Sequence, residues 1–306
     1  MSDFGIIGIG RIGTSMARNM SSNGIIVSLF DKSHNSLDNL KNDYPELDSS
    51  LVFDDINKFI SSISKPRKVL ILVPSGPALD EVISLLIQHL DSNDILIDGG
   101  NTHPNVSFEN HQTIKSKNLL YLGMGVSGGV EGVLKGPSIM IGGDTNAFNQ
   151  VKNIFSRITS ETINGSKSFE FFGDSNQGHF VKMIHNGIEY VEMQLISSIY
   201  YLMINSKKYS YEDVAKIFNK WNDIDLNSYL LEISLLKLTE KTDDNYLLDR
   251  IDDKADDNGT GRWMLKHAID LGCSVSMLNS AIDSRFISGN NITRSKATKM
   301  IKEDKK

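Results

Sequence analysis

The chain has 306 residues, of which 40% are apolar, so it is long enough to bury a sizeable core and to hold two domains. Its net charge of −6 provides no overall basic field for nucleic acid, and its single cysteine, Cys273, excludes an internal disulfide framework. Because a first strand is expected by residue 4 and no apolar run reaches about 18 residues, we expect a cytoplasmic protein with neither signal peptide nor membrane span. No spacing of ligands suggests a metal site.

A glycine motif follows the first expected strand. The strand leads into Gly8, Gly10 and Gly13, in the pattern Gly-x-Gly-x-x-Gly, and then into a helix. Such glycines allow a tight turn, a close approach of pyrophosphate to the backbone, and close helix–strand packing. A second strand, 25–30, ends at Asp31, where an acid can bind the adenosine ribose. The pattern predicts dinucleotide binding; the alternative is a glycine-rich turn of another α/β protein.

Strands and helices alternate through the first half of the chain. We expect further strands at 67–73, 94–98, 119–122 and 138–141, with a helix that ends at Leu90. This rhythm predicts an α/β, Rossmann-like doubly wound sheet. Ligands of such sheets bind beyond the carboxyl ends of the strands. The expected turns there contain Pro74, Asn101 and Ser127-Gly128-Gly129.

The second half is predicted to be helical. A long helical pattern covers about 176–205, so we place a domain boundary near Gly173. Residues 1–173 would form the dinucleotide-binding domain, and 174–306 a C-terminal all-α domain for substrate binding and dimerisation. The lysine-rich tail, 293–306, is expected to be solvated and partly disordered.

One stretch of the long helix carries an unusual set of polar side chains. At 100° per residue, one helix face would present an amine, an imidazole, an amide, a carboxylate and a phenol. These belong to Lys182, His185, Asn186, Glu189 and Tyr190. A solvated polar face is the alternative to a functional site.

These motifs together resemble 6-phosphogluconate dehydrogenase, within the β-hydroxyacid dehydrogenase superfamily. The resemblance runs through nearly the whole chain in the family's order, and the run His179-Phe-Val-Lys-Met-Ile-His-Asn-Gly-Ile-Glu-Tyr190 is its most specific part. The other matching segments are Gly8–Gly13, Ile97–Thr102, Gly125–Gly129, Gly136–Met140, Leu226–Ile233, Gly259–Trp263 and Arg285.

The resemblance implies a role for each matching residue. Lys182 would be the general base that takes the proton of the C3 hydroxyl, and Glu189 the acid that protonates the enediol after CO₂ is lost. His179 could be a capping or core residue as readily as a ligand. The sugar acid would be bound by Asn101, Ser127, Gly128, Gly129, His185 and Asn186, and its phosphate by Tyr190, Thr260 and Arg285. The cofactor would be bound by Gly8, Gly10, Arg11, Ile12, Gly13, Asp31, Lys32, Val73, Pro74 and Asn101.

The chain departs from the long form of the family in three places. It ends at Lys306 without the long form's C-terminal segment. It has Asn258 and Pro74 at two positions where the long form has lysine. We therefore expect a short-form enzyme. Substitute phosphate ligands could come from Lys254, Arg262 or the tail that begins at Arg294.

The predicted activity is oxidative decarboxylation of 6-phosphogluconate to ribulose 5-phosphate and CO₂, with reduction of NAD. NADP is the less expected cofactor, because NADP enzymes of the family carry Asn-Arg where this chain has Asp31-Lys32. One alternative is a β-hydroxyacid dehydrogenase that acts on an unphosphorylated 3-hydroxy acid, and a more remote one is a non-catalytic dinucleotide sensor. We expect a homodimer or higher homo-oligomer whose partner is a small sugar-acid phosphate, with no nucleic acid and no membrane.

Overall fold

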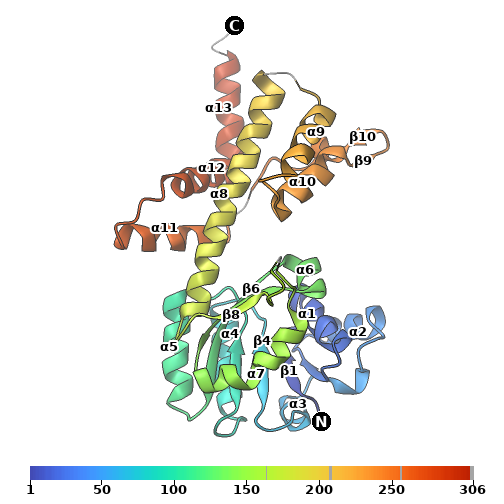
Figure 1. Cartoon of the computed structure of the whole chain (residues 1–306), viewed down its shortest axis with the longest axis vertical. Helices are drawn as coiled ribbons and strands as arrows, with labels where there is room; N and C mark the ends of the chain where they lie inside the picture. The colour runs from blue at the N-terminus through green and yellow to red at the C-terminus, as the bar shows by residue number, and fades with distance from the viewer. Residues whose placement is uncertain (163, 207–208, 256, 304–306) are drawn as a thin grey trace. The chain divides into compact units, whose positions relative to one another are not determined.

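The computed structural model describes residues 1–162, 164–206, 209–255 and 257–303. By its contacts the chain divides into two compact units, Met1–Met183 and Ile184–Lys306 (Figure 1). The division falls within one long helix, α8 (Gln177–Ser206). The domain boundary expected near Gly173 precedes the start of this helix and stays a prediction.

The first unit is built on an eight-stranded sheet in the order β3-β2-β1-β4-β5-β6-β7-β8. Neighbouring strands are parallel except for β6 and β7, which are antiparallel. This arrangement confirms the predicted doubly wound sheet. The strands are β1 (Phe4–Ile7), β2 (Val27–Phe30), β3 (Val52–Phe53), β4 (Lys68–Ile71), β5 (Ile95–Asp98), β6 (Leu120–Ser127), β7 (Ser138–Gly143) and β8 (Phe169–Phe171).

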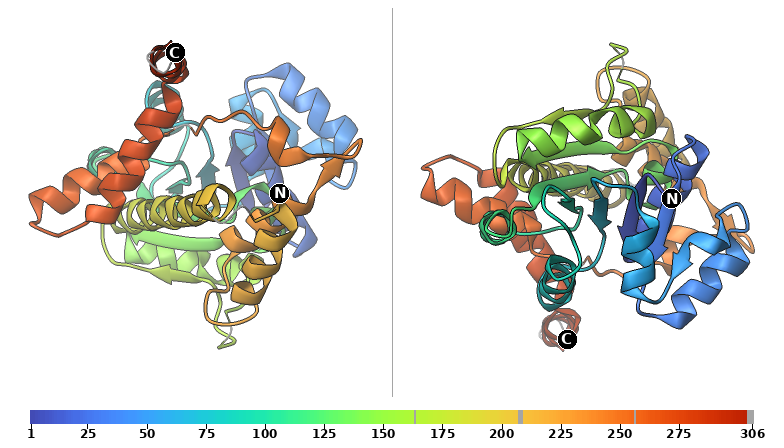
Figure 2. Two further views of the ribbon diagram at one scale, coloured as in Figure 1. Left: turned by 90° about the horizontal axis from the view of Figure 1, so that it is seen from above. Right: turned by 90° about the horizontal axis from the view of Figure 1, so that it is seen from below.

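Helices cover both faces of this sheet because successive strand residues point to opposite sides (Figure 2). In β4, for example, Leu70 packs into one core and Ile71 into the other. The first core also receives side chains of α1 (Arg11–Ser22), α2 (His34–Asp43), α6 (Gly129–Lys135) and α7 (Thr145–Ile158). The second receives those of α3 (Ile56–Ser62), α4 (Pro77–Ile87) and α5 (Pro104–Lys115).

Strand β6 continues five residues beyond its predicted end. It was expected to stop at Leu122 but runs to Ser127, because β7 pairs with it antiparallel from Leu122↔Gly143 to Ser127↔Ser138. The added residues include glycines, which weaken a strand signal in the sequence. The extension brings the Ser127-Gly128-Gly129 turn to the end of this strand pair.

The second unit is predominantly helical, as predicted. It contains the rest of α8, α9 (Tyr211–Asn222), α10 (Tyr229–Thr239), α11 (Thr260–Asp270), α12 (Ser276–Gly289) and α13 (Asn291–Glu303), with the short hairpin β9 (Lys241–Thr242) and β10 (Asn245–Tyr246). One apolar cluster joins α8, α9 and α10 around Phe218, and another joins α8, α11 and α12 around Tyr190 and Ile282. No helix of the described ranges has the length and apolar character needed to cross a membrane.

The described part of the tail is helical. Residues 293–303, from the tail expected to be solvated and partly disordered, lie in α13 (Asn291–Glu303), and residues 293 and 295–301 are exposed, in agreement with the expected solvation. Arg294 anchors this helix: its guanidinium donates to Asp253 Oδ2 at 2.7 Å and to the carbonyl oxygen of Ser288 at 3.1 Å. Lysine, alanine and methionine are also good helix formers, a tendency that the charge of the tail concealed. Residues 304–306 lie outside the described ranges.

Candidate active site

The glycine turn after β1 has the geometry that a dinucleotide requires. Gly8 has φ +92°, a region that side chains rarely adopt, and a Cβ at Gly13 would overlap the carbonyl oxygen of Gly8. At Gly10, by contrast, no atom lies within 4 Å of the position that a Cβ would take. The backbone at Gly10 is thus open to a pyrophosphate, which fits the predicted site.

Three predicted turns meet at the carboxyl ends of neighbouring strands. A Cβ at Gly8 would lie 2.9 Å from Val73 Cγ1, which places the turn after β4 beside the glycine turn. A Cβ at Gly100 would lie 3.1 Å from the carbonyl oxygen of Val73, which places the turn after β5 next in line. Pro74 and Asn101 lie in these two turns, and Asn101 is exposed. The parallel order of β1, β4 and β5 therefore assembles residues that are far apart in the sequence.

The carboxylate of Asp31 is held in place by backbone groups. Its Oδ2 accepts a hydrogen bond from Ile9 N at 3.0 Å, and its Oδ1 accepts one from Ser33 N at 2.9 Å. The neighbouring Lys32 forms an ion pair with Glu81 of α4. The acid is thus fixed beside the glycine turn, while the adjacent cation is already partnered by another carboxylate.

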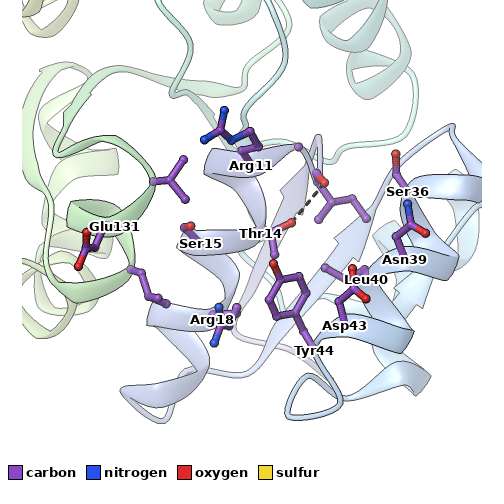
Figure 3. A pocket seen from close by; sticks show the side chains of 14 residues that line it. Arg11, Thr14, Ser15, Arg18, Ser36, Asn39, Leu40, Asp43, Tyr44 and Glu131 are labelled. Carbon is purple, nitrogen blue, oxygen red and sulfur yellow. Dashed lines mark hydrogen bonds between the residues drawn. The ribbon is translucent and has the colours of Figure 1, made fainter. Parts of the chain in front are cut away.

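A pocket of about 460 Å³ opens on the outer side of α1, between α2 and α6 (Figure 3). Gly10 and Arg11 line it, together with Arg18, Tyr44 and Glu131. The other predicted cofactor residues, among them Ile12 and the residues of the β2, β4 and β5 turns, do not line it. This pocket therefore adjoins the glycine turn, the first of the three turns described above, and does not reach the turns after β4 and β5.

Lys182 lies where α8 packs directly on the strand pair β6–β7. A Cβ at Gly178 would overlap the backbone of Gly123, and one at Gly125 would overlap Lys182 Cβ. Glycines on both sides thus allow a close approach of helix to sheet. Lys182 is only 8% exposed. Ser127, at the end of β6, is half-buried and is followed by Gly128 and Gly129, both with positive φ.

The next turns of α8 belong to the second unit. His185 Nδ1 lies 3.3 Å from Glu189 Oε2 and 3.2 Å from Asn186 Oδ1, so the imidazole contacts both of the other predicted residues. Asn186 is buried, whereas the side chains of His185 and Glu189 are 29% and 37% exposed. The imidazole and the carboxylate therefore remain accessible to solvent.

Tyr190, Thr260 and Arg285, the predicted phosphate ligands, lie close together in the second unit. The guanidinium of Arg285 stacks on the ring of Tyr190, with its carbon 3.9 Å from the ring centroid. A Cβ at Gly261 would lie 2.6 Å from the same ring, so only a glycine lets α11 begin so close to α8. Burial, opposed by a hydrogen bond from Thr260, raises the pKa of Tyr190, so the phenol keeps its proton and can donate it.

Asn258 is the centre of this cluster. In the sequence this position stood out only because the long form of the family has a lysine there. Its Oδ1 accepts hydrogen bonds from the Tyr190 hydroxyl at 2.9 Å and from the Thr260 hydroxyl at 2.8 Å. Asp257 Oδ1 also accepts from Tyr190, at 3.1 Å. The Asp-Asn-Gly-Thr run, typical of side-chain-capped turns, could have indicated this arrangement. A phosphate would have to take these hydroxyl donors from Asn258.

Two of the proposed substitute cations already have carboxylate partners. Arg262 Nε lies 2.6 Å from Asp257 Oδ2, and Arg294 is bound to Asp253. Both arginines therefore have carboxylate partners within the same unit. Within the described ranges, no three histidine, cysteine, aspartate or glutamate side chains gather as a metal site would require.

Family models match both parts of the chain. Residues 3–166 match the NAD binding domain of 6-phosphogluconate dehydrogenase, and residues 178–306 match the C-terminal domain of the same enzyme. The chain belongs to the 6-phosphogluconate dehydrogenase family. The family prediction from sequence is thereby confirmed.

Individual relatives agree with this assignment. The chain is 36% identical over 302 residues to a decarboxylating 6-phosphogluconate dehydrogenase of Staphylococcus epidermidis, covering 98% of this chain and 64% of that protein. It is 36% identical over 299 residues to the enzyme of Escherichia coli, with 97% and 64% covered. The chain thus spans a little under two thirds of the length of these curated relatives.

Solved structures show the same fold. A 6-phosphogluconate dehydrogenase of Plasmodium falciparum, studied without ligand, with NADP⁺ and with 6-phosphogluconate, superposes with a TM-score of 0.90 at 36% identity, covering 98% of this chain and 64% of that one. A 3-hydroxyisobutyrate dehydrogenase of Salmonella typhimurium has a TM-score of 0.73 at 16% identity, with 92% of each chain covered. The second likeness concerns the fold alone.

Proposed function

We propose that this chain catalyses the oxidative decarboxylation of 6-phosphogluconate to ribulose 5-phosphate and CO₂. The observation that carries the proposal is the cluster of Arg285, Tyr190 and Thr260, because a guanidinium and two hydroxyl donors suit a phosphate ester. An unphosphorylated hydroxy acid would have no use for this cluster. Membership of the family supports the same substrate.

Lys182 and Glu189 are the proposed acid–base pair. A bound nicotinamide supplies the hydride acceptor. The amine of Lys182 takes the proton of the C3 hydroxyl as the hydride leaves C3. The resulting 3-keto acid then loses CO₂ while the Lys182 ammonium returns that proton to the C3 oxygen, which gives an enediol. Glu189 donates a proton to the carbon that lost the carboxylate, which becomes C1 of the product. The contact of Glu189 with His185 orients this carboxyl group at the surface of α8.

The sugar-acid backbone is assigned to residues that follow strands of the sheet and to two residues of α8. Asn101, Ser127, Gly128 and Gly129 follow strands of the sheet, and backbone amides at such turns can bind a carboxylate and hydroxyl groups. His185 and Asn186 would contribute an imidazole and an amide from α8. The roles of these residues are part of the proposal.

We infer that NAD is the preferred cofactor. Both oxygens of Asp31 are fixed by backbone amides, so the carboxylate stays where the adenosine ribose would bind, and it would repel a 2′-phosphate. Lys32 could offset that repulsion, but Glu81 partners it. The proposed partners are thus NAD and a sugar-acid phosphate. We propose further that the chain associates with a second copy of itself and acts in the cytoplasm.

A substrate screen tests the function. The purified protein would be given 6-phosphogluconate, gluconate or 3-hydroxyisobutyrate with NAD or NADP, while reduced cofactor and CO₂ are followed together. We expect equal amounts of reduced cofactor and CO₂ from 6-phosphogluconate. Reduced cofactor without CO₂ from an unphosphorylated acid would instead identify a simple hydroxyacid dehydrogenase, and no turnover of any acid would point to a dinucleotide sensor.

A further inference from the structure

A chain of four buried polar side chains crosses the interior of the first unit. His179 Nδ1 lies 2.8 Å from Ser107 Oγ, which lies 3.1 Å from the hydroxyl of Tyr121. That hydroxyl donates to Asp98 Oδ2 at 3.4 Å. Asp98, Ser107 and Tyr121 are fully buried and His179 is 2% exposed. Because buried polar groups are costly unless they are paired, such a network strongly restricts the geometry of the elements that it joins.

The two ends of this network lie next to proposed active-site residues. At one end, Asp98 Oδ1 accepts a hydrogen bond from Gly100 N at 3.0 Å, which shapes the turn that presents Asn101. At the other end, His179 stands in α8 three residues before Lys182, on nearly the same side of the helix. The imidazole also faces the backbone oxygens of Asp98 and Gly100, although its Nε2 has no well-aligned hydrogen bond.

The helix at this point has little freedom to move. A Cβ at Gly123 would lie 2.9 Å from His179 Nδ1 and 2.8 Å from Ser107 Oγ, so the strand β6 touches the network directly. The first side-chain carbons of Lys182, Cβ and Cγ, are seated against Gly125 in the same strand. His179 is therefore the side chain that connects a fixed helix to the turn of Asn101.

We propose that His179 is a positioning residue that, through Ser107, Tyr121 and Asp98, fixes the Asn101 turn relative to the amine of Lys182. This inference rests on the proposed function, in which Asn101 binds substrate and Lys182 is the base. Errors of about 1 Å in the placement of reacting groups can cost on the order of 100-fold in rate. Loss of the network should consequently slow the chemical step more than it weakens cofactor binding.

A second buried histidine provides a matched control. His111 stacks on the same Tyr121, with ring centroids 5.5 Å apart, and its Nε2 lies 3.3 Å from Asp144 Oδ1. It is 5% exposed, and none of its described contacts reaches the turn at 98–101. His111→Phe therefore removes a buried imidazole that stacks on Tyr121 but makes none of the hydrogen bonds that run from His179 to Asp98.

The experiment compares His179→Phe, His179→Gln, Tyr121→Phe and His111→Phe in the full chain with 6-phosphogluconate. We expect His179→Phe and Tyr121→Phe to lower kcat by about 10- to 100-fold, a larger factor than the accompanying rise in KM for the nicotinamide cofactor. The deuterium isotope effect with C3-deuterated substrate should rise, because hydride transfer becomes more rate-limiting. His179→Gln should restore part of kcat, since its amide can bond to Ser107. His111→Phe should lower the melting temperature and leave kcat and the isotope effect unchanged.

The outcomes separate this inference from the proposed function. An active wild type whose His179→Phe and His111→Phe variants lose kcat equally, with no change in isotope effect, would overturn the positioning role alone. A wild type without turnover of 6-phosphogluconate would refute the function. In that case the positioning role is tested by the acetylation of Lys182 with acetic anhydride, measured as a function of pH by peptide mass spectrometry. A pH dependence of acetylation that His179→Phe alters and His111→Phe does not would support the inference. A pH dependence that His179→Phe leaves unaltered would refute it.

Discussion

Lys182 and Glu189 are assigned different steps, so their variants should fail differently. Lys182→Met should lower hydride transfer by roughly 10²–10⁴-fold, because the C3 oxygen loses its base. Glu189→Gln should lose turnover by a similar factor while still reducing cofactor in a first turnover, since its role follows loss of CO₂. Stopped-flow measurement of reduced cofactor checks both, with cofactor affinity as the control. Unimpaired turnover in Glu189→Gln would contradict the decarboxylation mechanism.

Asp31 should determine cofactor choice. Asp31→Asn keeps a hydrogen-bond acceptor for Ile9 N but removes the charge that repels a 2′-phosphate. The ratio of kcat/KM for NAD to that for NADP should therefore fall, and Glu81→Gln should lower it further by releasing Lys32. Steady-state kinetics with both cofactors measures this. A wild type that uses NADP as well as NAD would show that the inferred preference is wrong.

His179 should also affect the free energy of unfolding at acid pH. Burial lowers the pKa of this histidine from its ordinary value of 6.5, so the folded state holds it neutral. Below pH 6.5 the unfolded chain binds a proton that the folded chain does not, and stability is lost as the pH falls, by at most about 1.4 kcal/mol per pH unit. The free energy of unfolding, measured with urea between pH 7.5 and 5, should fall less steeply with falling pH in His179→Phe than in the wild type. Equal slopes would mean that folding does not lower the pKa of His179.

At the scale of elements, the start of α11, the middle of α8 and Arg285 of α12 form the proposed phosphate site. Arg285→Met should remove one charge-assisted contact, worth roughly 1.5–3 kcal/mol, and raise KM for 6-phosphogluconate by about 10- to 100-fold. Arg262→Met serves as the comparison and should have a smaller effect on this KM, because Arg262 is bound to Asp257 and reaches Tyr190 only through that carboxylate. A larger effect from Arg262 than from Arg285 would shift the phosphate site to the outer side of α11. Activity with gluconate should be insensitive to both changes.

Helix α13 bears on the suggestion that the tail completes a phosphate site. Its first cation, Arg294, is bound to Asp253, Ser288 and Asn291 of the same chain. These contacts give α13 a structural role within its own unit. A phosphate role for Arg294 would require it to exchange a carboxylate partner for the substrate.

For the whole molecule, we expect self-association. The second unit exposes many large apolar side chains, which monomeric proteins usually cover. They include Tyr201, Leu202, Tyr229, Leu236, Ile269, Leu271, Met277, Phe286 and Ile287. Light scattering should give the mass of a dimer or larger assembly. A monomer at a concentration of tens of micromolar would contradict this expectation, and Leu236→Glu with Phe286→Glu should shift an oligomer toward monomer.

Local patterns in the sequence were sufficient for the class of fold, the glycine turn and the polar run of α8. Each of these features is set by residues that are close in the chain. Gly8 and Gly13 mark a tight turn, Asp31 marks the end of a strand, and the residues from Lys182 to Tyr190 share the spacing of one helix face. The family assignment could be made from the same runs. For these features the determining interactions are short-range, and a single sequence displays them.

Other features were decided only by tertiary contacts. The sequence does not show that Asn258 would accept bonds from Tyr190 and Thr260, or that Asp253 would hold Arg294 and stabilise α13. Nor could it show that His179 and Asp98, 81 positions apart, are connected through Ser107 and Tyr121. The physical reason is that the partner of a polar side chain is chosen by burial. In water each of these groups is satisfied by solvent, and only the folded chain, by removing that solvent, makes one distant residue the required partner.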